Sequence, residues 1–172
     1  MALWGNWRWL SNPVLLVTIR ILFGAFFIFT GVLKLMEPRE EFEAVIRAYQ
    51  IFPAAVIPWI SLSLPWLELT VGTCLALGFL TTAATWMSGT ILLGFTLALG
   101  YTVVMGINLE DCGCFGSTGF KQSGSTAFIR NLFLLALFAP ILRYPAHAWS
   151  LDAFLEKEPR TSSTPSSPER KH

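Results

Sequence analysis

Four long apolar stretches constrain this chain more than any other feature of its sequence. They run over about residues 14–36, 55–80, 83–106 and 126–142, and about 20 apolar residues in helical form cross the hydrocarbon of a bilayer. Backbone groups in hydrocarbon must find hydrogen bonds within their own segment, which favours helices. The period-two alternation typical of membrane barrels is not seen. The sequence therefore predicts an all-α integral membrane protein, a bundle of four transmembrane helices.

The composition supports lipid as the surrounding solvent. Of 172 residues, 53% are hydrophobic and only 13% are charged, whereas a soluble domain carries about 25% charged residues. A domain this small cannot hide such a surplus of apolar side chains in its interior. The formal net charge of +1 lacks the basic footprint that nucleic-acid binding requires. We expect membrane lipid, and no nucleic acid, among its partners.

Residues 37–52, between the first two spans, have a different pattern. Pro38 and the acidic Glu40 and Glu41 are typical of a helix start. Apolar residues then recur at the spacing i, i+3, i+4, i+7, namely Phe42, Val45, Ile46 and Tyr49. This spacing predicts an amphipathic helix on the membrane surface. Two roles stay open for it, packing as a cap on the bundle or docking a partner.

The chain divides into a membrane domain and a tail. Residues 1–145 hold the four spans, and residues 146–172 are rich in Pro, Ser, Thr and charge, which predicts a largely disordered tail. Four crossings place both termini and the turn at residues 81–82 on one side of the membrane. The amphipathic helix and the loop at residues 107–125 lie on the other side. Lys and Arg are almost evenly divided between the two sides, so charge alone does not orient the chain.

The loop after the third span contains the sequence Cys112-Gly113-Cys114. A single intervening glycine lets two cysteines approach within disulfide distance, because glycine accepts unusual dihedral angles. The ring so closed is small and strained, and strained disulfides are the exchangeable kind. As a dithiol, the pair keeps a resolving cysteine beside the attacking one. We therefore predict that Cys112 and Cys114 are a catalytic redox pair.

Cysteines in such a loop can also serve a purely structural disulfide or a metal site. A structural disulfide that only ties the loop is the serious rival. A closed metal site takes four ligands, and the remaining candidates are poorly placed, since Cys74 lies inside the second span and His147 follows the fourth. We predict no metal site. Cys74 has no assigned role.

Charged side chains occur inside or at the ends of the spans, and such residues usually face the bundle interior or water. They are Arg20, Lys34, Glu68 and Arg130. If the polar faces of the first two spans contact each other, Glu68 approaches Arg20. The two residues differ by ~9 Å in their depth along the helices, at 1.5 Å per residue. This pair would either fix the helix register or form a proton or quinone site. No firmly bound cofactor is predicted, and a quinone near Glu68 and Arg20 stays open.

Several segments resemble a known family. Residues 20–24 and 31–35 of the first span, and residues 64–69 with Gly72 of the second, are similar to DoxX-like membrane proteins. The loop at residues 111–116 resembles more specifically the MauE branch, the methylamine utilisation membrane proteins. The resemblance in layout covers about residues 14–143. It implies a four-span bundle that acts with a periplasmic thioredoxin-like protein in the maturation of methylamine dehydrogenase, whose small subunit is rich in disulfides. The wider group is linked to thiol, sulfur and quinone redox chemistry.

The leading hypothesis is a membrane component of a thiol–disulfide redox relay. Cys112 and Cys114 would exchange with a thioredoxin-like partner on the extracytoplasmic side, where disulfides persist. This places the chain in the plasma (inner) membrane as a multi-pass protein with cytoplasmic termini. The main alternative is a non-enzymatic membrane scaffold or subunit whose cysteines are structural. A small transporter is the least favoured of three hypotheses, because no inverted repeat is evident.

Overall fold

The computed structural model describes residues 12–107, 109, 112–113, 123–143 and 152. These residues form five helices and no strand: α1 (Pro13–Met36), α2 (Arg39–Ala48), α3 (Ile57–Leu77), α4 (Thr81–Val104) and α5 (Gly124–Arg143). All of them except α2 are long and apolar enough to cross a bilayer, which makes four candidate spans. The predicted all-α bundle of four spans, with a separate helix between the first two, is confirmed.

Local sequence explains where the helices begin and end. α1 begins after Asn12, whose side chain accepts a hydrogen bond of 3.0 Å from the Val14 N–H, and Pro13 occupies the first helical position. α3 ends at Leu77 and is followed by Gly78, which has a left-handed φ of 70° that glycine adopts without strain. Leu80 is also left-handed, with φ 47°. The connection from α3 to α4 is therefore a tight turn.

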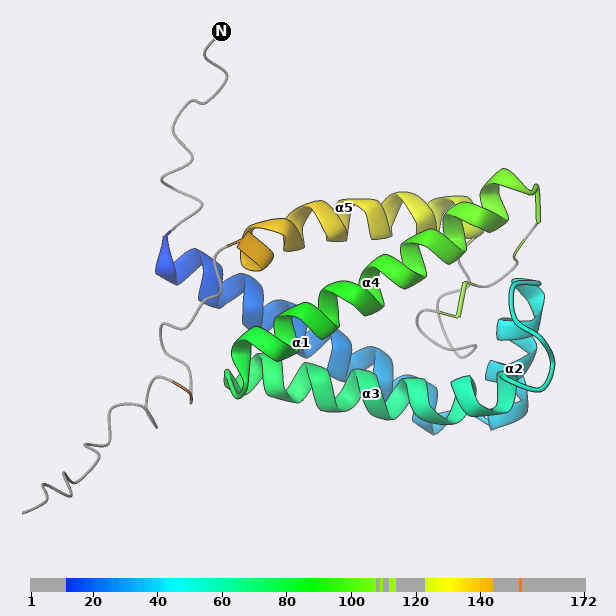
Figure 1. The fold of residues 1–172 in the computed structure, drawn as a ribbon, viewed down its shortest axis with the longest axis horizontal. Helices are drawn as coiled ribbons and strands as arrows, with labels where there is room; N and C mark the ends of the chain where they lie inside the picture. Colours follow the sequence, from blue (N-terminus) through cyan, green and yellow to red (C-terminus); the bar gives the residue numbers. More distant parts are fainter. Residues whose placement is uncertain (1–11, 108, 110–111, 114–122, 144–151, 153–172) are drawn as a thin grey trace, which may run out of the picture.

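The spanning helices pack mainly as two pairs, α1 with α3 and α4 with α5. Figure 1 shows that α4 starts beside α3 at their shared turn and then diverges from it toward the end where α2 lies. α2 crosses that end of the α1–α3 pair. The divergence leaves space between α3 and α4 near α2, and the candidate site occupies that space.

Glycines bring α1 and α3 into close contact. A Cβ atom added at Gly24 would lie 2.7 Å from the Ala76 backbone nitrogen, and one added at Gly72 would lie 2.8 Å from the Ile28 nitrogen. Small residues at such crossings let backbones approach in lipid, where helix packing supplies much of the stability. The two contacts also fix the register of α1 against α3.

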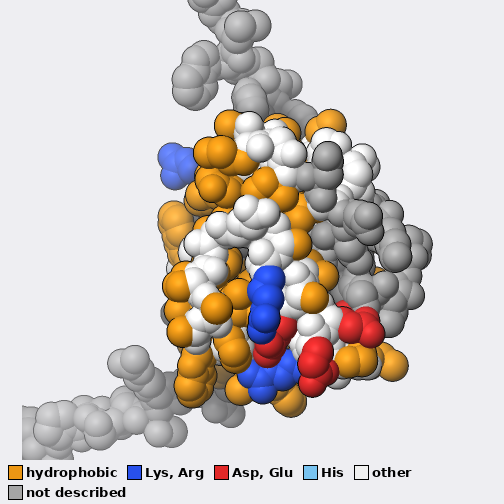
Figure 2. All heavy atoms as spheres, turned by 90° about the vertical axis from the view of Figure 1, so that its right-hand side faces the viewer, with side chains coloured by type: hydrophobic (Ala, Val, Ile, Leu, Met, Phe, Trp, Pro, Cys, Tyr) orange, Lys and Arg blue, Asp and Glu red, His pale blue; other side chains and the backbone are white. Residues whose placement is uncertain are grey.

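The outward faces of the spans are strongly apolar. Trp59 is 72% exposed and Val104 is 83% exposed, an arrangement that suits contact with lipid tails more than with water. Figure 2 views the α2 end of the molecule and shows charged side chains gathered there, flanked by hydrophobic ones. The charged sequence of α2 accounts for this cluster. That end of the bundle therefore suits the membrane–water interface.

Asp152 is the one residue described after α5, and it contacts the turn between α3 and α4. Its carboxylate accepts hydrogen bonds from the backbone N–H groups of Leu80 (2.9 Å) and Thr81 (2.8 Å). Its own N–H donates to the Gly78 carbonyl at 3.2 Å. Asp152 thus caps α4, whose N-terminus has no cap from its own side chains. The rest of the predicted tail at residues 146–172 lies outside the described residues.

Candidate functional site

Cys112 lies at the α2 end of the bundle and is only 1% exposed. It packs in an apolar cluster with Tyr49, Leu99, Leu109 and Ala127. Cys114, its predicted redox partner, lies outside the described residues. The pairing of the two sulfur atoms is therefore a prediction from the sequence, whereas the placement of Cys112 is a structural observation.

The amphipathic helix holds the cysteine loop in place. The Tyr49 hydroxyl, just after α2, donates a buried hydrogen bond of 2.6 Å to the backbone carbonyl of Cys112. Gly113 has a φ of +64°, and a Cβ atom there would lie 2.5 Å from Cγ1 of Val45. Both the backbone conformation and the close contact with α2 require glycine at this position. The apolar face of α2 therefore packs onto the bundle and also positions Cys112.

An apolar cavity of about 250 Å³ adjoins this loop. Residues of α2, α3, α4 and the segment Cys112–Gly113 line it, and its walls are almost wholly apolar. Residues that define its walls are Phe42, Val45 and Tyr49 from the α2 region, Leu64 of α3, Phe95 of α4, and Cys112. The sequence did not predict this cavity, because hydrophobic periodicity does not report how far two helices diverge. The only hint of the cavity in the sequence was Gly94 in the third apolar stretch, because a glycine can leave room beside a helix. In the structure, a Cβ atom added at Gly94 would have no neighbour within 4 Å.

A buried ion pair lies behind one wall of the cavity. Lys34 Nζ is 2.6 Å from Oε1 and 2.8 Å from Oε2 of Glu68, and both side chains are almost fully buried. The same nitrogen lies 4.9 Å from the ring centroid of Phe95 and 5.6 Å from that of Phe42. These two rings also line the cavity, so they separate the ion pair from the space next to Cys112.

The prediction that Glu68 approaches Arg20 is wrong, because Glu68 pairs with Lys34 instead. Gly24 faces Ala76, and Glu68 lies beside Gly31. The eleven residues from position 20 to position 31 correspond to ~17 Å along α1, too far for an arginine side chain to reach. Arg20 is buried toward the opposite end of α1, where Asp152 is its electrostatic partner.

The last of the charged residues predicted inside the spans, Arg130, lies on α5. It is half-buried there. Its neighbour Asn131 is buried and lines a small cavity together with Thr30, Lys34 and Glu68, so α5 adds a polar side chain to the wall of this cavity. Within the described ranges, no group of three or more His, Cys, Asp or Glu side chains could hold a metal ion.

Comparisons with known proteins give significant matches over most of this chain. The family model described as "Methylamine utilisation protein MauE" matches residues 12–144. Methylamine utilization protein MauE of Methylorubrum extorquens (strain AM1) is 30% identical over 130 residues, which cover 76% of this chain and 69% of the relative. No solved structure gives a significant match.

Proposed function

Because this chain belongs to the MauE family of methylamine utilisation membrane proteins, we propose that it is the membrane component of a thiol–disulfide redox relay. Cys112 and Cys114 exchange with a thioredoxin-like protein on the extracytoplasmic side of the inner membrane, and both termini of the chain are cytoplasmic. The observation that carries the proposal is the position of Cys112. It is held by Tyr49 and α2 at the end of a lipid-embedded bundle, against an apolar cavity.

The exchange is a two-electron transfer. A thiolate of the partner attacks the Cys112–Cys114 disulfide, forms a mixed disulfide and releases one thiolate of this chain. The second partner thiol then displaces the remaining cysteine, so the partner gains a disulfide and this chain becomes a dithiol with two electrons and two protons more. Because Cys112 is 1% exposed, we propose that the partner attacks Cys114 first and that Cys112 leaves as the thiolate. In the reverse direction, Cys112 is the resolving cysteine.

Trapping the mixed disulfide tests this proposal. In the reverse direction of the exchange, the Cys114 thiolate attacks the disulfide of an oxidised partner and Cys112 resolves the mixed disulfide. A Cys112→Ser variant cannot complete that second step, so Cys114 should remain joined to the partner after acid quenching of intact cells. Non-reducing electrophoresis and mass spectrometry should identify a thioredoxin-like protein in the adduct. Cys74→Ser alone should leave exchange unchanged, and the Cys112→Ser, Cys114→Ser double variant should form no adduct. Absence of an adduct with both single variants, Cys112→Ser and Cys114→Ser, would refute exchange.

We further propose that the relay acts in maturation of methylamine dehydrogenase, whose small subunit is rich in disulfides. The relative's name links it to methylamine utilisation, and a disulfide-rich product needs an oxidising thiol system. In a host that grows on methylamine, the double cysteine variant should accumulate less of the small subunit than the wild type. A normal level of oxidised small subunit would contradict this assignment.

A second candidate function is a membrane scaffold whose cysteines are structural. The burial of Cys112 and its tight contact with Tyr49 favour it, because a disulfide that only closes a loop needs no access. This alternative predicts that the double cysteine variant keeps full biological activity once its lower stability is compensated by a lower growth temperature. The redox relay predicts complete loss of activity at every temperature.

A further inference from the structure

We propose that the apolar cavity beside α2, α3 and α4 binds one acyl chain of a phospholipid from the leaflet on the α2 side of the membrane. The juxtaposition that carries this inference is a cavity with almost wholly apolar walls, open between two membrane-spanning helices, at the depth of a single leaflet. The lipid site does not depend on thiol exchange, because only the size, lining and position of the cavity support it.

The lining of the cavity suits an apolar occupant and not a polar one. No charged side chain of the described residues lines it, and the buried ion pair of Lys34 and Glu68 lies outside its walls. Tyr49 lines it, but its hydroxyl already donates a hydrogen bond of 2.6 Å to the Cys112 carbonyl. Water stays in a buried site only where several polar groups bind it. Hydrocarbon is therefore the occupant that these walls accept.

The volume of the cavity suits a stretch of acyl chain. An apolar cavity of roughly 150 Å³ holds a benzene molecule, so at the same volume per carbon atom a cavity of about 250 Å³ has room for about ten carbon atoms. This is a large part of one chain and much less than a whole phospholipid. Protein interiors leave few voids larger than a water molecule. A space of this size that opens to hydrocarbon is therefore expected to be filled by it.

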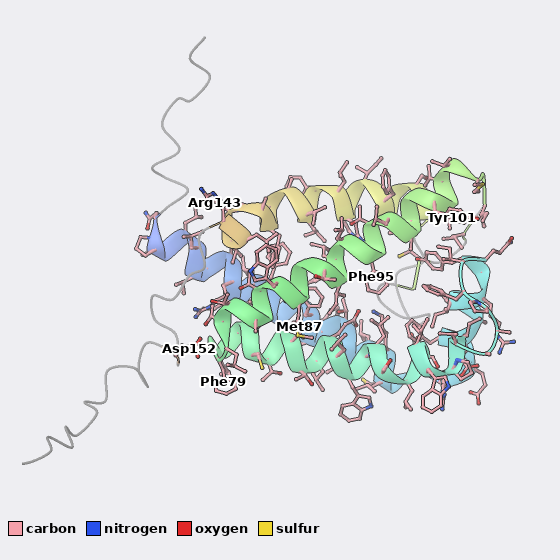
Figure 3. All side chains as sticks on the ribbon, viewed as in Figure 1. Phe79, Met87, Phe95, Tyr101, Arg143 and Asp152 are labelled. Atoms are coloured by element: carbon pink, nitrogen blue, oxygen red, sulfur yellow. The ribbon has the colours of Figure 1, made fainter. Side chains whose placement is uncertain are left out.

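The cavity opens toward the bilayer. Gly94 of α4 lines it, is exposed, and would place an added Cβ atom in open space. Leu97, about one turn further along α4, is also exposed. Figure 3 places Phe95 between Met87 and Tyr101, in the part of α4 that has diverged from α3. Since α3 and α4 are both candidate spans, an acyl chain can enter between them from the side.

The depth of the cavity points to the leaflet next to α2. Ala98 and Ile91 both line the cavity, and at 1.5 Å per residue they lie about 9 Å and about 20 Å from Val104 along α4, which ends there. Leu64, on the opposite wall, lies about 10 Å from Ile57, where α3 begins. One leaflet contributes about 15 Å of hydrocarbon. Most of the cavity therefore lies within the leaflet on the α2 side.

Photocrosslinking of the full-length protein in phosphatidylcholine nanodiscs tests the site. The probe is a phosphatidylcholine with a diazirine in the middle of one acyl chain. Labelling at Ile91 and Phe95 should clearly exceed labelling at Phe133 of α5, which is 68% exposed and reports general contact with lipid. Gly94→Phe should lower labelling at Ile91 about tenfold, because a ring the size of benzene occupies much of the cavity.

Two further variants make the result specific to the cavity. Leu97→Phe is the matched control, since it adds the same ring at a residue that is 64% exposed and outside the lining. It should label as the wild type does. Ala98→Leu narrows the cavity by a smaller group from the same helix and should also lower labelling at Ile91. This second variant tests the site even if Gly94→Phe does not fold.

Moving the diazirine along the chain tests the leaflet. Ala98 is nearer the α2 end of α4 than Ile91 is, so a diazirine close to the glycerol should favour Ala98 and one close to the terminal methyl should favour Ile91. The reverse order would mean that the chain enters from the opposite leaflet, and would overturn the assignment.

Two other results would overturn the lipid site itself. The first is labelling at Ile91 and Phe95 that is no higher than labelling at Phe133 in the wild type. The second is unchanged labelling in the cavity-filling variant, Gly94→Phe or Ala98→Leu, that elutes as a monodisperse protein with the unfolding temperature of the wild type. Either result would show that the cavity holds no more lipid than the outer surface of the bundle does.

Discussion

At the residue scale, the packing of α1 against α3 decides which of the buried charged side chains form a pair. Arg20, Lys34 and Glu68 stand out in the sequence because charges in a span are costly, and all three are buried. The partner of Glu68 depends on the register of α1 against α3, which the contacts of Gly24 and Gly72 determine. Hydropathy carries no information on that register, so the sequence pointed to Arg20 where Lys34 is the partner.

Removing one partner of the Lys34–Glu68 ion pair should destabilise the bundle more than removing both. Lys34→Met leaves a buried carboxylate without its counter-charge and should cost about 3–5 kcal/mol of unfolding free energy. The Lys34→Met, Glu68→Leu double variant should recover most of that loss, because both charges are then removed. The free energy of unfolding of each variant is measured in mixed micelles. Arg47→Gln, at a pair with Glu43 that is 60% exposed on the arginine side, should cost less than about 1 kcal/mol. Equal losses for Lys34→Met and the double variant would contradict the pairing.

Tyr49 should affect both stability and thiol chemistry through its hydrogen bond to the Cys112 carbonyl. Tyr49→Phe leaves that buried carbonyl without this donor and should cost about 1–2 kcal/mol. It should also raise the rate at which Cys112 reacts with maleimide, because the loop is held less tightly. Tyr101→Phe, at a tyrosine that is 41% exposed, serves as control. Unchanged maleimide kinetics in Tyr49→Phe would show that the hydrogen bond does not position the loop.

At the element scale, the sequence predicted the helices well and their contacts only in part. The apolar stretches were long enough to specify the spans, and the i, i+3, i+4, i+7 pattern specified α2. The pattern also marked Val45 and Tyr49 as one face, yet it could not show that this face contacts Cys112 and Gly113. That contact joins segments 63 residues apart in the chain, and local periodicity cannot report it.

The α1–α3 crossing should tolerate no side chain at its glycines. Gly24→Ala places a methyl group against the Ala76 backbone, and relief of that overlap should cost about 1–3 kcal/mol. Gly94→Ala, on the open side of α4, should instead stabilise the protein by about 0.5–1 kcal/mol through higher helix propensity. In thermal unfolding, we expect a lower unfolding temperature for Gly24→Ala and a higher one for Gly94→Ala than for the wild type. The same sign for both would contradict the close crossing.

Asp152 should stabilise the start of α4 from a distant part of the chain. Asp152→Ala removes the acceptor for the Leu80 and Thr81 N–H groups and should cost about 1 kcal/mol. Hydrogen exchange at these two amides should accelerate, whereas exchange in the middle of α4 should not change. Asp152→Asn retains one side-chain oxygen and should give an intermediate effect. Unaltered exchange at both amides would argue against the cap.

At the scale of the whole molecule, the number of spans follows from one-dimensional hydropathy, and the cavity does not. Membrane crossing is a property of each segment alone, so the four spans were predictable. The cavity arises because α4 diverges from α3 while α2 closes one end, a property of three helices together. The redox proposal depends on this arrangement, since it places Cys112 in the wall of the cavity at the α2 end of the bundle.

The central claim is that Cys112 and Cys114 form a reversible two-electron couple, and a redox titration in nanodiscs tests it most directly. After equilibration at a series of potentials, acid quenching and maleimide labelling would count reduced thiols by mass. Cys112 and Cys114 should lose their labels together at one midpoint, more oxidising than about −300 mV, the upper bound typical of structural disulfides, while Cys74 stays labelled throughout. Three labelled thiols at every potential, or a Cys112–Cys114 bond that resists reduction well below that value, would contradict the redox relay.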